Sequence, residues 1–164
     1  MHIPFFAKWP AKINKNIKYE KRIHHTDIFS TILGAANIEP PKEIEIDGVN
    51  LIPFLTNQKS GEPHETLYWK NASYQAIIHD HWKLMRSTFP QKQEYLYNLN
   101  SDPYEQNNLA IKEVAVKNLL NKKLDEHVES MPETKWPQSV FMPVTIDKPV
   151  TEYKDGDELI YWPN

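Results

Sequence analysis

The stretch EYLYNLNSDPYEQNNLA, residues 94–110, decides the fold class expected for this chain. Its first half has the two-residue period of a β-strand, and Asp102-Pro103 ends that strand in a turn. Asn107 and Asn108 are candidate N-caps, because short polar side chains accept hydrogen bonds from the first free N–H groups of a helix. The stretch therefore predicts a strand, a turn and the entry to a helix.

The residues on both sides extend this pattern. After the stretch, residues 110–131 have the period of an amphipathic helix, in which Leu120 and Leu124 belong to the apolar face. Four strand-like segments lie between residues 66 and 99, and the last of them belongs to the stretch itself. Their short connections favour antiparallel pairing. The predicted class is therefore α+β, with a small antiparallel sheet of about four strands packed on one long helix. The segments are Thr66–Lys70, Tyr74–Ile78, Trp82–Arg86 and Glu94–Leu99.

The N-terminal part has the pattern of a strand followed by a helix. Residues 3–9 form a short apolar run that suits a strand from the interior of a larger sheet. Thr26 or Asp27 caps a predicted helix that ends near Ala36, and Asn37 is a plausible left-handed stop. The apolar stripe of this helix is Ile28, Phe29, Ile32 and Leu33.

Composition excludes several classes of protein. The net charge of −3 provides no basic field for nucleic acid, and no apolar run is long enough to span a bilayer. The absence of cysteine excludes disulfides, thiolate metal sites and a cysteine nucleophile. The first residues have no basic start and no long apolar core, so we do not expect them to be a signal peptide.

Five blocks in the chain, taken in order, resemble type I sulfatases of the alkaline-phosphatase-like superfamily. IPFFAKWPAKI at residues 3–13 is similar to Pro-Phe-x-x-x-Trp-Pro-Gly-x-Ile, and HTDIFSTIL at residues 25–33 to Asp-x-x-Pro-Thr-Leu. IDGVNLIPFL at residues 46–55 is similar to Asp-Gly-x-x-Leu-x-Pro-x-Leu, and WKL at residues 82–84 is the fourth block. The 94–110 stretch resembles Glu-Leu-Tyr-Asp-Leu, a spacer, Asp-Pro-x-Glu and Asn-Leu-Ala.

The chain also departs from the family pattern. Ser30 stands where the family usually has proline, Ala11 where glycine is common, and His79-Asp80 where Asp-Gly often lies between two strands. Sulfatases use a formylglycine made from Cys/Ser-x-Pro-x-Arg and bind calcium with a paired Asp-Asp and a later Asp-Asn or Asp-Gln. The sequence contains neither this nucleophile motif nor an adjacent aspartate pair. The resemblance thus implies the last third of a sulfatase, with no cofactor in this chain and calcium and formylglycine only in the full-length parent.

The resemblance also implies an organisation in three parts. Residues 1–56 are expected to be the tail end of the large α/β sulfatase domain, and residues 57–131 its small C-terminal subdomain. Residues 132–164 are expected to form an extended tail, with a possible strand at residues 158–162. Alone, residues 1–56 would expose apolar side chains and promote association, because their partner would be the missing N-terminal sulfatase domain.

Candidate substrate-binding residues are few. His24 and His25 precede a helix whose N-terminus could help hold an anionic ester, although a packed or solvated loop pair is the commoner arrangement. By resemblance, the loop from Arg86 to Lys92 lies near the mouth of the active-site cleft, where either cation could pair with a sulfate or carboxylate of a sugar. His81 belongs to the same candidate set. No catalytic residue and no metal ligand is assigned, since His79 and His81 alone make a poor zinc site.

Four aromatic residues leave two interpretations open. Tyr68, Trp69, Tyr74 and Trp82 could form a platform on which sugar rings stack, or they could pack between the sheet and its helix. The second interpretation is the commoner one for aromatic residues on a small sheet.

Three functional hypotheses follow. The first is the C-terminal part of a sulfatase acting on a sulfated carbohydrate, in which this chain is structural, lines the rim of the cleft and is inactive alone. The second is a non-catalytic glycan-binding or interaction module, and the third is a truncated product without function. Neither nucleic acid nor a membrane span is expected, and a bacterial parent would be periplasmic or secreted.

Overall fold

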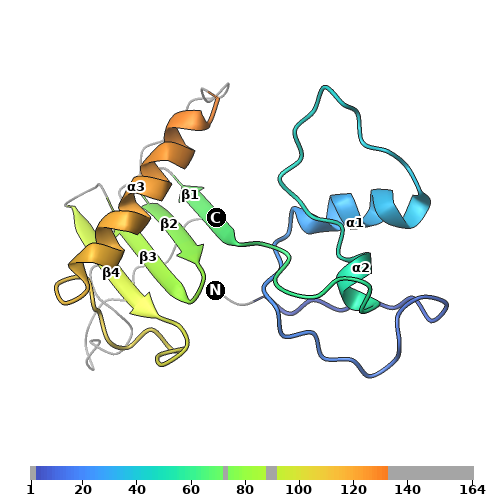
Figure 1. Cartoon of the computed structure of the whole chain (residues 1–164), viewed down its shortest axis with the longest axis horizontal. Coiled ribbons are helices and arrows are strands. Elements are labelled where there is room, and N and C mark those ends of the chain that lie inside the picture. Colours follow the sequence, from blue (N-terminus) through green and yellow to red (C-terminus); the bar gives the residue numbers. More distant parts are fainter. Residues whose placement is uncertain (1–2, 72–73, 88–91, 133–164) are drawn as a thin grey trace, which may run out of the picture. The chain divides into compact units, whose positions relative to one another are not determined.

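The computed structural model describes residues 3–71, 74–87 and 92–132. The chain divides into two compact units, Met1–Glu65 and Thr66–Asn164. The described residues of the first unit contain helices α1 (Asp27–Ala36) and α2 (Ile52–Leu55), as Figure 1 shows. Those of the second contain strands β1 (Thr66–Asn71), β2 (Tyr74–His79), β3 (Trp82–Ser87) and β4 (Gln93–Asn98), followed by helix α3 (Val114–Ser130).

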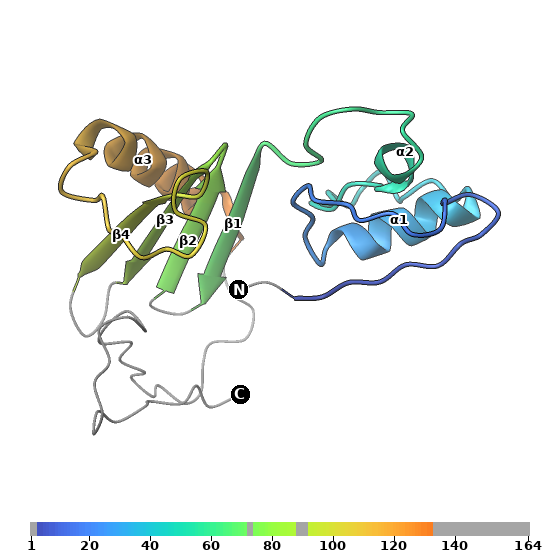
Figure 2. The ribbon, with the colours of Figure 1, turned by 90° about the horizontal axis from the view of Figure 1, so that it is seen from below.

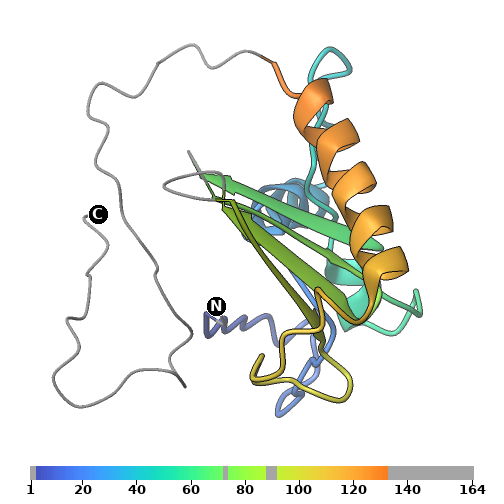
Figure 3. The ribbon, with the colours of Figure 1, turned by 90° about the vertical axis from the view of Figure 1, so that its left-hand side faces the viewer.

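The second unit is a four-stranded antiparallel sheet in the order β1-β2-β3-β4. Figures 2 and 3 show α3 lying along one face of this sheet. Ile77, Leu84 and Leu96 on three strands pack with Leu120 and Leu124 of α3, and all five side chains are at most 1% exposed. The predicted α+β fold is therefore confirmed, and the four strands lie within about a residue of their predicted bounds.

The register of the sheet divides the four aromatic residues between its two faces. Tyr68 pairs with Ile77 in the row that faces α3, and it packs on the core together with Trp82. Because neighbouring residues of a strand point to opposite faces, Trp69 lies on the other face with Tyr74. The four rings therefore do not form a single sugar-stacking platform, and for Tyr68 and Trp82 the packing interpretation holds.

Polar side chains of the 94–110 stretch organise the turn between β4 and α3. The carboxylate of Asp102 accepts hydrogen bonds from the N–H groups of Gln106 (3.0 Å) and Asn107 (2.8 Å), and these bonds lower the pKa of Asp102. Asn108 Oδ1 accepts from the N–H groups of Leu96 and Ala110, each at 3.0 Å. The expectation that Asn107 or Asn108 caps the helix was wrong, because both are engaged in the turn.

Helix α3 begins later than the periodicity predicts. The N–H groups of Lys112 and Glu113 bond to the carbonyl of Leu109, which places a tight turn before the first helical residue, Val114. The helix ends at Ser130, close to the predicted end at residue 131. The predicted tail, residues 132–164, lies outside the described residues apart from Pro132.

An ion pair joins two of the sequence blocks that were recognised separately. Lys83 of the WKL block lies on β3, and its Nζ is 2.7 and 2.6 Å from the two carboxylate oxygens of Glu105. Lys83 is 9% exposed, and Glu105 has a left-handed backbone with φ of 59°. Since a non-glycine residue adopts this conformation at some cost, the pair helps to hold the turn in place.

We expect Glu105→Gln to lower the free energy of unfolding of the second unit by about 1–3 kcal/mol, because it leaves the buried Lys83 ammonium without its counter-charge. Lys122→Gln is the control, since Lys122 and Glu126 form an exposed pair at 3.7 Å. Such a pair contributes about 0.3–0.5 kcal/mol. Urea titrations of both variants test the prediction, and equal losses would contradict it.

The first unit lacks the strand expected at residues 3–9. Residues 3–8 have no regular secondary structure, and Ile3, Phe5 and Phe6 are exposed. A strand needs a neighbour to satisfy its backbone groups, and the described residues of this unit contain no other strand. The predicted strand does not form, so this prediction is wrong. The apolar side chains on which it was based are exposed.

Helix α1 has its predicted bounds, but neither Thr26 nor Asp27 caps it through its side chain, and its apolar side is not covered within the unit. It spans Asp27–Ala36 and is followed by Asn37 with a left-handed φ of 54°. Leu51 and Phe54 form the buried apolar part of the first unit. By contrast, three residues of the α1 stripe are exposed: Ile28, Phe29 and Ile32.

The described residues contain no helix that is both long enough and apolar enough to cross a membrane.

Candidate functional site

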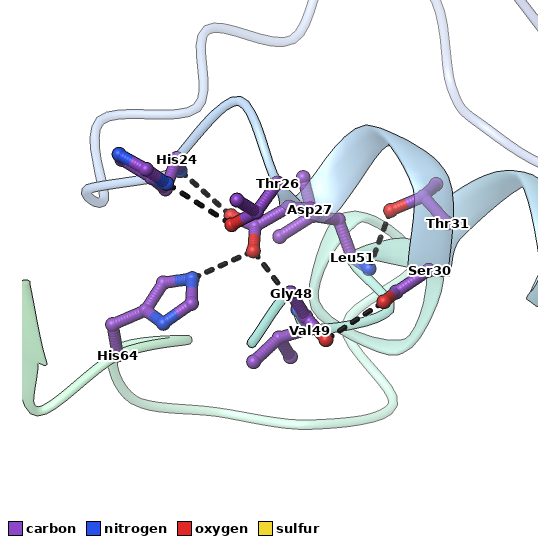
Figure 4. Close-up of polar contacts among 9 residues, drawn as sticks. All are labelled: His24, Thr26, Asp27, Ser30, Thr31, Gly48, Val49, Leu51 and His64. Atoms are coloured by element: carbon purple, nitrogen blue, oxygen red, sulfur yellow. Dashed lines mark hydrogen bonds and ion pairs between the residues drawn. The ribbon is translucent and has the colours of Figure 1, made fainter. Parts of the chain in front are cut away.

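A buried carboxylate is the centre of the polar cluster in the first unit. Asp27, at the start of α1, is 0% exposed. Its Oδ2 accepts a hydrogen bond from the N–H of His24 at 2.7 Å, and its Oδ1 accepts one from the N–H of Val49 at 2.9 Å. His64 Nε2 lies 2.7 Å from the same Oδ1. Figure 4 shows these side chains around Asp27. Asp27 thus ties three segments together.

The local sequence explains why these segments meet. A carboxylate in the first turn of a helix is stabilised by the positive end of the helix dipole. Gly48 allows the loop to approach α1, because a Cβ there would lie 2.1 Å from the carbonyl oxygen of Thr26. Ser30 Oγ donates to the carbonyl of Gly48 at 2.7 Å, and Thr31 Oγ1 accepts from the N–H of Leu51 at 3.0 Å. Ser30, which replaces the family proline, therefore joins the second and third blocks.

His24 and His25 lie beside this carboxylate. The ring of His24 is 3.0 Å from the hydroxyl of Thr26 through Nδ1, and the centroids of the two imidazoles are 4.2 Å apart. Burial lowers the pKa of His24, and the charge of His25 lowers it further. His24 is half-buried and His25 is exposed, so His25 is the more accessible of the two to an anion.

The three candidates in the second unit do not form one site. His81 lies in the turn before β3, where its ring contacts that of Trp82 at 5.4 Å. Arg86 lies near the other end of β3, where its backbone is opposite that of Glu94 on β4. Lys92 immediately precedes β4 at the same end of the sheet. His81 and Arg86 are five positions apart along the extended chain, so their backbones are about 17 Å apart. Arg86 and Lys92 therefore share an end of the sheet that His81 does not reach.

Arg86 holds the sheet to its helix. Its Nε donates to Gln75 Oε1 at 2.7 Å, its Nη1 to Asn121 Oδ1 at 3.1 Å and its Nη2 to Asp125 Oδ1 at 2.6 Å. The planar guanidinium can serve several acceptors at once, so it connects β2 and β3 to α3. Lys92 differs from Arg86 because its side chain is exposed.

Sequence reasoning missed the contact between Asp27 and His64. Asp27 was expected only as a helix cap, and His64 was not singled out. The two residues are 37 positions apart, so neither periodicity nor local spacing indicates their contact. Within residues 3–71, 74–87 and 92–132, no group of three or more His, Cys, Asp or Glu residues is arranged to hold a metal ion.

The sheet covered by α3 and the contacts that link the sequence blocks through Lys83, Ser30 and Gly48 belong to a chain whose family model is that of a sulfatase C-terminal region. The chain belongs to the family described as N-sulphoglucosamine sulphohydrolase, C-terminal, whose model matches residues 1–133. Recognition of the sulfatase C-terminal region from the sequence blocks is thereby confirmed.

The alignments with individual relatives are shorter than the match to the family model. The chain is 43% identical over 68 residues to the uncharacterized sulfatase YdeN of Escherichia coli K12, which is 42% of this chain and 12% of that protein. It is 29% identical over 104 residues to the steryl-sulfatase of Rattus norvegicus, which is 63% of this chain and 17% of the relative. The chain therefore spans only a small part of the length of these sulfatases.

A solved structure shares the fold. It is a Bacteroides thetaiotaomicron protein described with the metabolism of multiple glycosaminoglycans, and it superposes with a TM-score of 0.59 at 22% identity. The superposition covers 73% of this chain and 27% of that protein. At this identity the likeness concerns the fold, because one fold can carry several chemistries.

Proposed function

We propose that this chain is the C-terminal part of a sulfatase that hydrolyses sulfate esters of a sulfated carbohydrate. The observation that carries the proposal is the family match over residues 1–133, since that family is described by a sulfated amino sugar. The steryl-sulfatase relative makes a sulfated steroid the competing substrate class. The carbohydrate is favoured because the family match covers more of the chain.

The reacting groups are proposed to lie in the rest of the parent protein. By family resemblance they are a formylglycine, which supplies the nucleophile for attack on sulfur, and a calcium ion, which neutralises the sulfate oxygens. The residues of this chain would then bind and orient the substrate at the rim of the cleft. We infer that exposed cations serve this purpose better than engaged ones.

Exposure and contacts divide the candidate rim residues into three groups. His25 and Lys92 are exposed, and each could approach an anionic group of the substrate. His24 contacts Thr26, and Arg86 is bound to α3, so both would act by positioning their neighbours. His81 is half-buried beside Trp82 and would contribute at a separate point.

The first unit is proposed to dock on the missing N-terminal sulfatase domain. Ile28, Phe29 and Ile32 are exposed on the apolar side of α1, and Phe6 is 91% exposed. Burying each large apolar side chain contributes roughly 1.5–3 kcal/mol, so this surface favours association with a large partner. The alternative to a docked sulfatase fragment is a non-catalytic glycan-binding module that binds its ligand through the second unit alone.

The experiment begins with the DNA upstream of the codon for Met1 and continues with the complete product. We expect an in-frame Cys/Ser-x-Pro-x-Arg motif and an Asp-Asp pair, and turnover of sulfated disaccharides faster than of steryl sulfate. Phe29→Lys should reduce association of the 164-residue chain alone but lower the soluble yield of the complete enzyme, because the same face is then buried.

Leu119→Lys is the matched control, since Leu119 is an exposed leucine on α3 and should change neither quantity. A secretory signal directly before Met1, with no upstream nucleophile motif, would support the glycan-binding module instead. Faster turnover of steryl sulfate would leave the sulfatase assignment intact and overturn the carbohydrate.

A further inference from the structure

One imidazole contacts the buried carboxylate of the first unit, and two more belong to the segment that precedes it. His64 Nε2 is 2.7 Å from Asp27, and His64 has a side chain only 9% exposed. The backbone N–H of His24 donates to the other oxygen of Asp27, and the rings of His24 and His25 lie 4.2 Å apart and tilted by 48°. Figure 4 shows His24 and His64 approaching Asp27 from different sides. Asp27 thus contacts the ring of His64 directly and holds the His24–His25 segment through a backbone N–H.

We propose that this histidine cluster makes the first unit acid-sensitive, so that protonation of His24, half-buried beside His25, loosens the junction between α1 and residues 48–51. Two positive charges on rings at this separation repel each other, and the half-buried His24 is poorly hydrated. Asp27 cannot move towards them freely, because it already holds Val49 and His64.

The groups that face His24 come from three segments and act in opposite directions. His25 and Asp27 belong to its own segment, Asp47 to the loop before Gly48, and His64 to the segment before β1. The two carboxylates favour a charged His24, whereas burial, His25 and His64 disfavour it. Burial is the largest of these influences, and the pKa of His24 is lowered.

The direction of the pH effect follows from this balance. A histidine whose pKa is lower in the folded than in the unfolded chain binds fewer protons when folded. Its contribution to stability is complete above the ordinary value of about 6.5 and is lost as the pH falls through that value towards the lowered one. The first unit should therefore open more readily under mild acid.

Amide exchange in the full 164-residue chain tests the proposal. Protection of the Val49 amide, corrected for its intrinsic exchange rate at each pH, should fall severalfold between about pH 7.5 and 5.5, because the pKa of His24 is lower in the folded chain. The Leu96 amide, which bonds to the neutral side chain of Asn108, is the reference in the second unit and should change less. Unchanged protection of Val49 would overturn the proposal.

Two variants separate the histidine pair from other acid effects. His25→Gln removes the repelling charge from an exposed position, so it should reduce the acid loss at Val49, whereas the part caused by the burial of His24 should remain. His127→Gln, in the second unit, should leave that loss as it is in the wild type. A full acid loss in His25→Gln would show that the pair of imidazoles does not cause the effect and would refute the proposal.

Discussion

Replacing Asp27 by alanine is expected to unfold the first unit of this chain. The substitution leaves the N–H groups of His24 and Val49 and the Nε2 of His64 without the acceptor they share. A buried donor that loses its partner costs about 1–3 kcal/mol, so these three part-buried donors together cost about 3 kcal/mol. A loss of that size is a large fraction of the stability of a small domain.

Amide exchange of Val49 and His24 measures this effect directly, because both amides donate to Asp27. Asp47→Ala is the matched control: Asp47 is an exposed carboxylate in the adjoining loop, and its loss should change stability by less than about 0.5 kcal/mol. Asp27→Asn should give an intermediate loss, since its amide nitrogen cannot accept a hydrogen bond. If Asp27→Ala protected these amides as well as the wild type does, the cluster would not hold the unit together.

The second large effect is expected from Leu124→Ala in α3. Leu124 is 1% exposed and packs with Ile77, Leu84 and Leu96 of the sheet. Truncating a buried leucine loses its transfer free energy and leaves a cavity, which together cost about 2–5 kcal/mol. Since α3 covers this face of the sheet, the whole second unit should be destabilised rather than the helix alone.

Leu119→Ala is the control that distinguishes the loss of core packing from the change in helix propensity. Leu119 lies on the same helix and undergoes the same chemical change, but it is 51% exposed. Its loss should alter the free energy of unfolding by less than about 0.5 kcal/mol. Urea titrations followed by far-ultraviolet circular dichroism compare the two variants. Similar midpoints for Leu119→Ala and Leu124→Ala would show that α3 does not pack on the sheet as described.

The sequence by itself determined the elements of the second unit and the family. Strand alternation and helical period depend on neighbours two to four residues apart, so they are readable without a structure. For this reason the sheet, the burial of Leu120 and Leu124, and the left-handed stop at Asn37 were predicted. Five motif blocks in order were enough to indicate the sulfatase class.

The tertiary structure alone decided which blocks touch and which candidate residues are engaged. The pairs Lys83–Glu105 and Asp27–His64 join positions 22 and 37 residues apart, and the chain path that brings them together leaves no local pattern. The contacts of Arg86 were also not predictable from local sequence, because its guanidinium donates hydrogen bonds to side chains of β2 and α3. The strand expected near Phe5 failed for a related reason: a strand is completed by hydrogen bonds to a neighbour, which local sequence cannot supply.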